Sequence, residues 1–240
     1  MTMVEMQQVL QSNLSGVLLR IRAACARAGR EQSGVRLIAV TKYADWAWVQ
    51  MLAGLHPVFG ENRPQQLSER SQQLPAVEWH LIGHLQRNKV QLALRHAALI
   101  HSVDSLRLLQ SIAAGAVAGR RPAVLLQVNV SREDSKTGFG ADELPRIWDQ
   151  VLENAEQVEI RGLMTMAAES SDPEDARPVF AELRHLRDLL NELPATRQRG
   201  IRLSELSMGM SGDFEQAVEE GATLLRIGSL LFRGLGADSG

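Results

Sequence analysis

Cysteine is almost absent from this chain of 240 residues, in which Cys25 is the single example. One cysteine excludes an intrachain disulfide and a cysteine-rich zinc site. Chains that depend on no disulfide suit a reducing compartment, so we expect a cytoplasmic location. The N-terminus has neither the basic start nor the short apolar core of a secretory signal peptide, which agrees with that expectation. No apolar run approaches the ~20 residues that a membrane-spanning helix needs.

Lysine is scarce as well. Lysine and arginine total 26 residues, but the lysines are only Lys42, Lys89 and Lys136. A genomic preference for arginine codons explains this ratio without any function. The formal net charge of −2 gives no global basic field, so we expect neither nucleic acid nor a membrane surface as a partner. Any chemistry that needs a side-chain amine has three candidates.

Apolar periodicity predicts a helix first and then alternating strands and helices. The spacing of Met6, Val9, Leu10, Leu14, Val17, Leu18 and Ile21 predicts an amphipathic N-terminal helix within residues 1–30 that ends near Ala28, before Gly29. The short apolar runs that follow are Leu37–Val40, Val58–Gly60, Glu78–Ile82, Ala98–Ser102, Ala123–Val130, Val158–Met164, Leu203–Ser207 and Leu224–Gly228. The helical patterns are Trp46–Ala53, Pro64–Gln73, Leu85–Leu94, Ser105–Ala118, Ala141–Asn154, Pro173–Leu193 and Asp213–Glu220. Pro194–Gly200 is expected to be a surface loop, and a short helical turn is expected after Ser229.

Eight strand–helix units in this length predict an α/β fold, a single (β/α)8 TIM barrel over residues 36–234 within one domain of residues 1–240. Several of the apolar runs are continuous, as in strands that are buried on both faces. The rival fold is an open, doubly wound sheet. No Gly-x-Gly-x-x-Gly follows the first strand, so the commonest ligand motif of that rival fold is missing.

Lys42 directly follows the first predicted strand, at the end of the barrel where active sites lie. Partial desolvation there would favour the neutral amine, which can attack an aldehyde and form an imine. The alternative is a surface lysine that extends from a strand end into water.

The loops after the seventh and eighth strands are the usual phosphate site of this fold. They read Gly209-Met210-Ser211-Gly212-Asp213 and Gly228-Ser229, in which glycines admit a phosphate close to backbone N–H groups and the serines can donate from their hydroxyls. The alternative is that both are ordinary helix N-caps. Arg226, near the end of the eighth strand, either faces a ligand ring nitrogen or forms a structural salt bridge.

His80 and His84 stand four residues apart, a spacing that binds metal on a helix. Here the segment reads as a strand and a loop, and no third ligand is suitably spaced, so no metal site is predicted. His80 is expected to be a hydrogen-bonded core histidine.

Several segments together resemble the pyridoxal phosphate homeostasis protein family, PLP-binding barrels of the alanine racemase N-terminal type (fold-type III). Their order and spacing, from about Arg36 to Phe232, carry the resemblance. The segments are Ala39-Val40-Thr41-Lys42, Phe59-Gly60-Glu61-Asn62, His80 to Lys89, Lys136-Thr137-Gly138, Arg161-Gly162-Leu163-Met164, Gly209-Met210-Ser211 and Arg226-Ile227-Gly228-Ser229.

The resemblance implies pyridoxal 5′-phosphate (PLP) as cofactor and a role for each matched residue. Lys42 would carry PLP as a Schiff base, Asn62 would line the site, and Met164 would contact the ring. Ser211, with the backbone around Gly212, Gly228 and Ser229, would bind the phosphate. Arg226 would face the pyridine nitrogen and keep it unprotonated, which makes the ring a poorer electron sink. Lys89 and Lys136 are interpreted as surface lysines, with secondary phosphate contacts as the alternative.

The chain departs from the family pattern in three places, at Arg63-Pro64, at Tyr43 and at Phe232-Arg233-Gly234. These differences bear on the rim of the site.

Three functions remain open at this point. The leading hypothesis is a largely non-catalytic protein of intracellular PLP homeostasis, monomeric, that passes PLP to apo-enzymes. The second is a PLP-dependent amino-acid racemase of modest activity, and the third is a protein-interaction barrel. Alanine racemases carry a further β domain that supplies a tyrosine base, for which this chain has no room after its eighth strand. Tyr43, the one tyrosine, is next to Lys42 and would point to the opposite face if the strand continued.

Overall fold

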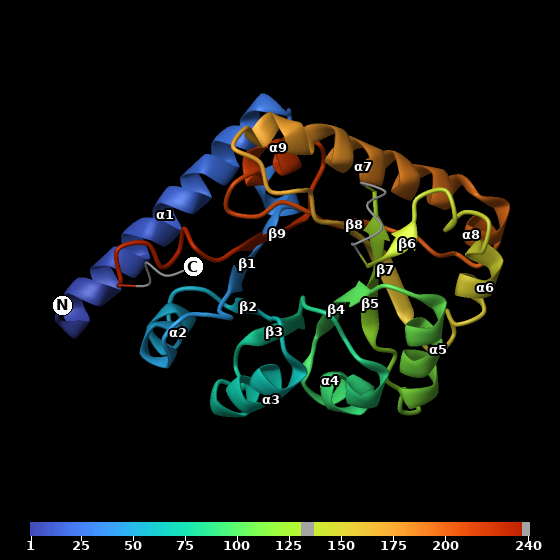
Figure 1. Cartoon of the computed structure of the whole chain (residues 1–240), viewed down its shortest axis with the longest axis horizontal. Helices are drawn as coiled ribbons and strands as arrows, with labels where there is room; N and C mark the ends of the chain where they lie inside the picture. The colour runs from blue at the N-terminus through green and yellow to red at the C-terminus, as the bar shows by residue number, and fades with distance from the viewer. Residues whose placement is uncertain (131–136, 237–240) are drawn as a thin grey trace.

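The computed structural model describes residues 1–130 and 137–236, and its centre is a closed ring of parallel strands (Figure 1). The spatial order is β4-β3-β2-β1-β9-β8-β7-β5, and β4 pairs with β5 to close the barrel. The ring strands are β1 (Arg36–Val40), β2 (Val58–Glu61), β3 (Glu78–Leu81), β4 (Leu99–Val103), β5 (Ala123–Asn129), β7 (Glu159–Met164), β8 (Glu205–Ser207) and β9 (Leu224–Ile227). A short strand, β6 (Phe139–Gly140), pairs with β5 beside the ring. The predicted (β/α)8 barrel is confirmed.

Helices surround the barrel because each crossover between parallel neighbours returns along the outside of the sheet (Figure 1). The helices are α1 (Met3–Arg27), α2 (Trp46–Ala53), α3 (Pro64–Gln73), α4 (Val90–His96), α5 (Leu106–Gly115), α6 (Trp148–Leu152), α7 (Arg177–Glu192), α8 (Pro194–Gln198) and α9 (Phe214–Glu219). The 3-10 turns in the described part of the chain are η1 (Gln32–Gly34), η2 (Arg87–Lys89) and η3 (Pro173–Ala176).

Two predicted segments differ from the structure. The helix expected over 141–154 is α-helical only in α6, because Pro145 lacks the N–H that a continuous helix would need, and the residues before α6 form turns. The loop expected over 194–200 contains α8, which begins with Pro194. The buried Thr196 holds this helix in place, since its hydroxyl accepts from Trp148 Nε1 at 2.7 Å and donates to the Leu190 carbonyl at 2.6 Å.

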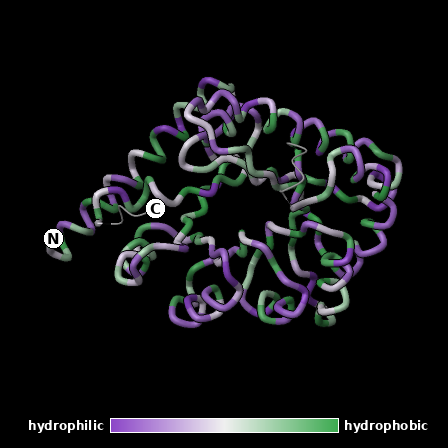
Figure 2. The backbone as a smooth tube through the Cα atoms, viewed as in Figure 1, coloured by the Kyte–Doolittle hydropathy of each residue, from purple (hydrophilic) through white to green (hydrophobic). Residues whose placement is uncertain are grey.

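The apolar core has two parts, one between the sheet and the helices and one inside the ring. The inner part is small, and its buried members are Ile38, Val58, Leu99, Ala123, Leu125, Met164 and Leu224. Polar residues take the remaining inward positions, among them His80, His101 and Arg226, which are all buried. Figure 2 shows hydrophobic and hydrophilic residues alternating along the outer helices, as expected for amphipathic helices that bury one face.

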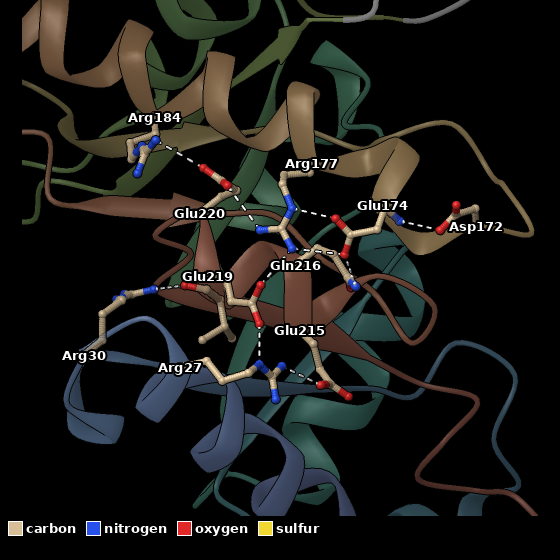
Figure 3. Close-up of polar contacts among 11 residues, drawn as sticks. Arg27, Arg30, Asp172, Glu174, Arg177, Arg184, Glu215, Gln216, Glu219 and Glu220 are labelled. Carbon is tan, nitrogen blue, oxygen red and sulfur yellow. Dashed lines mark hydrogen bonds and ion pairs between the residues drawn. The ribbon is translucent and has the colours of Figure 1, made fainter.

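Helix α1 lies across α9 and α2 and is held there by apolar and ionic contacts. Leu10, Leu14, Val17 and Ile21 are its buried apolar face, as the periodicity predicted. Arg27 extends from its last turn to Glu215 and Glu219 of α9, at 2.7 and 2.6 Å (Figure 3).

The ion pairs continue from α9 to α7, as Figure 3 shows. Arg177 contacts Glu219 at 2.7 Å and Glu220 at 3.2 Å, and it also pairs with Glu174 at 2.7 Å. One carboxylate, that of Glu219, therefore links α1 to α7 through two arginines.

Among the described residues, no helix is long and apolar enough to cross a membrane.

Candidate functional site

The residues predicted to bind the cofactor follow five strands that are consecutive around the barrel. These strands are β7, β8, β9, β1 and β2, and every pairing among them is parallel. Parallel strands bring their carboxyl ends to one face, so one side of the barrel mouth receives all of these residues. In order around the ring they are Met164, then Ser211 and Gly212, then Arg226, Gly228 and Ser229, then Lys42, then Asn62.

Lys42 lies in a turn just after β1 and is exposed to solvent. Its amine stands over the ring of Tyr43, 4.8 Å from the centroid. The expected partial desolvation of Lys42 is therefore not found, because the side chain is exposed. The strand does not continue to Tyr43, because β1 ends at Val40, so the argument that depended on its continuation does not apply.

Glu61 and Arg70 stabilise the turn that contains Lys42 through hydrogen bonds to its neighbours. The Thr41 hydroxyl donates to the buried Glu61 carboxylate, which also forms an ion pair with Arg70. Arg70 donates to the carbonyls of Thr41 at 2.7 Å and Ala44 at 3.2 Å, on either side of Lys42. Burial raises the pKa of Glu61, and the Thr41 hydrogen bond and the Arg70 charge oppose that rise.

Sequence reasoning missed this support for the lysine. The segment Phe59-Gly60-Glu61-Asn62 was considered only as a motif, and Arg70 was part of a helical pattern. One signal was available, because a carboxylate at the end of an apolar strand must find a cationic or hydrogen-bonding partner.

Asn62 follows β2 and is half-buried at the mouth. Its backbone touches the loop after β3, where a Cβ on Gly83 would lie 2.3 Å from the Asn62 carbonyl oxygen. Only glycine permits this approach. Met164, the last residue of β7, is fully buried in the inner apolar cluster.

Arg226 is a buried cation without an ion pair to any carboxylate among the described residues. Its guanidinium donates to the Ser207 hydroxyl at 2.5 Å and to the Thr165 carbonyl at 2.9 Å. Desolvation lowers its pKa to about 10, while the charge of Asp213 acts in the opposite direction. Among the described residues, Arg226 therefore forms no structural salt bridge, which was the alternative interpretation. Its guanidinium has further N–H donors that a ligand can accept.

The two predicted phosphate loops expose backbone N–H groups at the same mouth. Within the described residues, the N–H groups of Ser211, Gly212, Gly228 and Ser229 have no hydrogen-bond acceptor. Gly209 opens the first loop with φ +91°, and a Cβ there would lie 2.5 Å from Ala217 Cβ. These N–H donors lie in two short turns. The first turn precedes α9, and no helix follows the second turn within the described residues. The expected helical turn after Ser229 is a hydrogen-bonded turn, closed by Leu231 N–H to the Gly228 carbonyl at 2.9 Å.

The remaining candidates are two lysines and two histidines. Lys89 ends η2 after β3, and Lys136 lies outside the described residues. His80 is a buried, hydrogen-bonded core histidine, as predicted. His84 is exposed and contacts Asp104 at 3.0 Å.

The donor set fits PLP in its chemistry. An anionic phosphate requires several N–H or hydroxyl donors, which the two loops supply. An unprotonated ring nitrogen requires a donor, and the buried guanidinium supplies one. The aldehyde requires a primary amine, and Lys42 is the lysine nearest in the chain to the ends of these strands.

Comparison with known proteins gives the family. The model of the family described as "Alanine racemase, N-terminal domain" matches residues 17–235. The pyridoxal phosphate homeostasis protein of Aquifex aeolicus (strain VF5) is 41% identical over 224 residues, which cover 91% of this chain and 95% of that protein.

Two solved structures define the similarity in space. PipY of Synechococcus elongatus PCC7942, with PLP bound, superposes with a TM-score of 0.73 at 36% identity, over 89% of this chain and 99% of that one. An alanine racemase of Clostridium difficile 630 superposes with a TM-score of 0.72 at 14% identity, over 96% of this chain but 58% of that one, and so shares the fold. The chain therefore belongs to the pyridoxal phosphate homeostasis protein family, within the larger family of alanine racemase N-terminal domains.

Proposed function

We propose that this protein binds PLP as a Schiff base on Lys42 and takes part in intracellular PLP homeostasis without robust catalysis. One observation carries the proposal. Arg226 on β9, which pairs with the Lys42 strand β1, is a buried guanidinium without a carboxylate partner among the described residues, and four backbone N–H groups without an acceptor there lie in the loops after β8 and β9. PipY, a relative at 36% identity over nearly its whole length, has been solved with PLP bound, which supports the same ligand here.

Each residue has a role in this proposal. The amine of Lys42 binds the aldehyde carbon of PLP as a Schiff base. Asn62 lines the site beside Lys42, and Met164 contacts the PLP ring. Ser211, Gly212, Gly228 and Ser229 bind the phosphate through N–H groups and hydroxyls. Arg226 donates to the ring nitrogen. Bound PLP supplies an electrophilic carbon and an electron-accepting ring, and an arginine at the nitrogen leaves that ring unprotonated and less able to stabilise a carbanion.

The proposal extends to the cellular setting of the protein. Their name, pyridoxal phosphate homeostasis protein, supports a protein that limits free PLP and passes it to apo-enzymes. We place the protein in the cytoplasm, as a monomer, with residues 1–30 as a helix added to a barrel of residues 36–234 in one domain.

Borohydride reduction followed by peptide mass mapping tests the proposal. Reduction of the PLP-loaded protein should leave a pyridoxyl group on the peptide that contains Lys42. Lys42→Ala should lose both this adduct and the visible absorption of bound PLP. Lys89→Ala is the matched control and should keep both. An adduct on Lys89 or Lys136 alone, or none on the wild-type chain, contradicts the proposal.

A racemase of modest activity is the second candidate, and the contact between Lys42 and Tyr43 is the observation that favours it. The ring centroid of Tyr43 lies 4.8 Å from Lys42 Nζ, so a phenol is in the same turn as the proposed Schiff base. Steady exchange of an amino-acid α-proton in deuterated water, lost in Tyr43→Phe, would establish this activity. Transfer of PLP to an apo-enzyme without such exchange supports homeostasis alone.

A further inference from the structure

A line of four hydrogen bonds crosses the barrel interior, from Arg226 to the opposite end of the barrel. Arg226 Nη1 lies 2.5 Å from Ser207 Oγ, which lies 2.8 Å from His101 Nδ1. His101 Nε2 lies 2.9 Å from His80 Nδ1, and His80 Nε2 lies 2.8 Å from Glu78 Oε1. Ser207 is on β8 and His101 on β4, which are not neighbours in the sheet, so the line spans the ring (Figure 1).

Burial lowers the pKa of both imidazoles and so favours their neutral forms, and with neutral rings the carboxylate end of the line determines the direction of every bond up to Ser207. The guanidinium of Arg226 can only donate. Glu78 can only accept, because the hydrogen bond from His80, with a further contribution from Arg36, lowers its pKa to about 2. His80 therefore carries its proton on Nε2 and accepts at Nδ1.

The same reasoning gives the hydrogen-bond roles of His101 and Ser207. His101 must donate to His80 from Nε2, so it accepts at Nδ1 from the hydroxyl of Ser207. The hydroxyl oxygen of Ser207 then accepts from Arg226. Both imidazoles are neutral in this arrangement, and burial lowers the pKa of each.

A neutral His101 directs the Ser207 hydroxyl proton away from Arg226 and leaves the serine oxygen free to accept from the guanidinium. A protonated imidazole would carry an N–H at both ring nitrogens, and it could no longer accept from Ser207. It would also place a second positive charge beside the buried guanidinium, in a region of low dielectric constant. The groups that face His101 are His80 on β3, Ser207 on β8 and the charges of Arg226 on β9 and Arg36 on β1.

We propose that Ser207, His101 and His80 are positioning residues that hold the Arg226 guanidinium in place for the ring nitrogen of PLP. This inference rests on the proposed function. Arg226 makes two hydrogen bonds to described residues, one to the carbonyl of Thr165, just after β7, and one to the side chain of Ser207. Ser207 is thus the side chain that ties the guanidinium to the rest of the barrel, and the histidines fix the direction of its hydroxyl.

Ser207→Ala tests the proposal through PLP binding and absorption. Loss of a hydrogen bond to a charged group should weaken PLP affinity by about tenfold. The pH dependence of the visible band should shift, because the environment of the ring nitrogen changes. Ser207→Thr keeps a hydroxyl and should restore both properties. Mass mapping at saturating PLP should still find the adduct on Lys42.

Ser68→Ala is the matched control. The Ser68 hydroxyl contacts His96 Nε2 at 3.0 Å on the outer helices, so this variant also removes one serine–histidine hydrogen bond. It should bind PLP with wild-type affinity and an unchanged band. An equal effect of Ser68→Ala and Ser207→Ala would mean that general loosening, not positioning, is responsible, and would overturn the proposal.

Nitrogen-detected NMR of the wild-type histidines tests the line without any substitution. Both His80 and His101 should be neutral at pH 7, with the proton on Nε2. A proton on His101 Nδ1 would overturn the proposed direction. Glu78→Leu, which alters the half-buried far end of the line, should change the band of bound PLP as well.

The outcomes separate the two proposals. If wild-type protein forms no adduct on Lys42, the proposed function is wrong, whatever the tautomers are. If the adduct forms but Ser207→Ala and Glu78→Leu both keep the wild-type affinity and band, the positioning role is wrong and PLP binding stands.

Discussion

At the scale of single residues, the site depends on buried charges that are satisfied by partners on other strands and helices. Arg226 is tied to β8 through Ser207, and Glu61 is paired with Arg70 from α3. The exposed Lys42 is held by its backbone, since Arg70 binds the carbonyls of Thr41 and Ala44 on either side of it. Residues that do not touch the ligand therefore decide where the reactive amine stands.

Arg70→Ala should destabilise the fold and weaken PLP binding together. It leaves the fully buried Glu61 without its cation, and removal of one partner from a buried pair costs roughly 3–5 kcal/mol. Urea unfolding would measure the loss of stability, and spectral titration would measure PLP affinity.

Arg95→Ala, a change on α4 outside the site, is the control for Arg70→Ala. It should alter neither property appreciably. If Arg70→Ala retains wild-type stability, Glu61 is not held as an ion in the folded chain.

At the scale of elements, α1 shows which kind of contact secures a helix to the barrel. Its apolar face is fully buried at Leu10, whereas the side chain of Arg27 is 50% exposed in its ion pairs to α9. Exposed ion pairs are screened by water and salt, while buried apolar contacts are not.

Leu10→Ala should cost about 3 kcal/mol of unfolding free energy, because it removes buried methyl groups and leaves a cavity. Arg27→Ala should lower the unfolding free energy much less than Leu10→Ala does. At high salt, the unfolding free energy of Arg27→Ala should equal that of the wild type. Leu19→Ala should have almost no effect, because Leu19 of α1 is 64% exposed. Urea unfolding at low and high ionic strength measures all three, and a larger loss for Arg27→Ala than for Leu10→Ala would reverse the assignment.

At the scale of the whole molecule, stability should fall as the pH falls from 7 to 5. Burial lowers the pKa of His56, His80 and His101 in the folded chain. The unfolded chain binds protons on these groups near pH 6.5 and the folded chain does not, so stability is complete above that pH and is lost below it. His101 alone accounts for up to about 2 kcal/mol between pH 7 and 5.

Urea midpoints of the wild-type chain and of His101→Gln at both pH values check this prediction. The variant should lose part of the pH dependence, whereas buried carboxyl groups with raised pKa values, such as Glu61 and Asp213, act in the opposite direction in both proteins. Glu78 contributes a further loss only below about pH 4.5, since its pKa is lowered to about 2 in the folded chain. Equal slopes for the two proteins would contradict the role assigned to His101.

The sequence by itself determined the fold class and the order of the elements. The apolar run Ala123–Leu126 indicated a buried strand because it is short and continuous, and the apolar face of residues 6–21 indicated a helix through its spacing, since both signals are local. The site motifs were also visible as polar residues at strand ends.

Only the tertiary structure decided which groups are neighbours and which are buried. The pairing of Arg70 with Glu61, the exposure of Lys42 and the line from Arg226 to Glu78 join residues from different strands and helices. Local pattern does not say which residues become partners, because the contacts form only when helices pack on the sheet and the sheet closes into a ring. Closure also makes strands β4 and β8 face each other across the interior, and that is why His101 and Ser207, 106 residues apart in the chain, share a hydrogen bond.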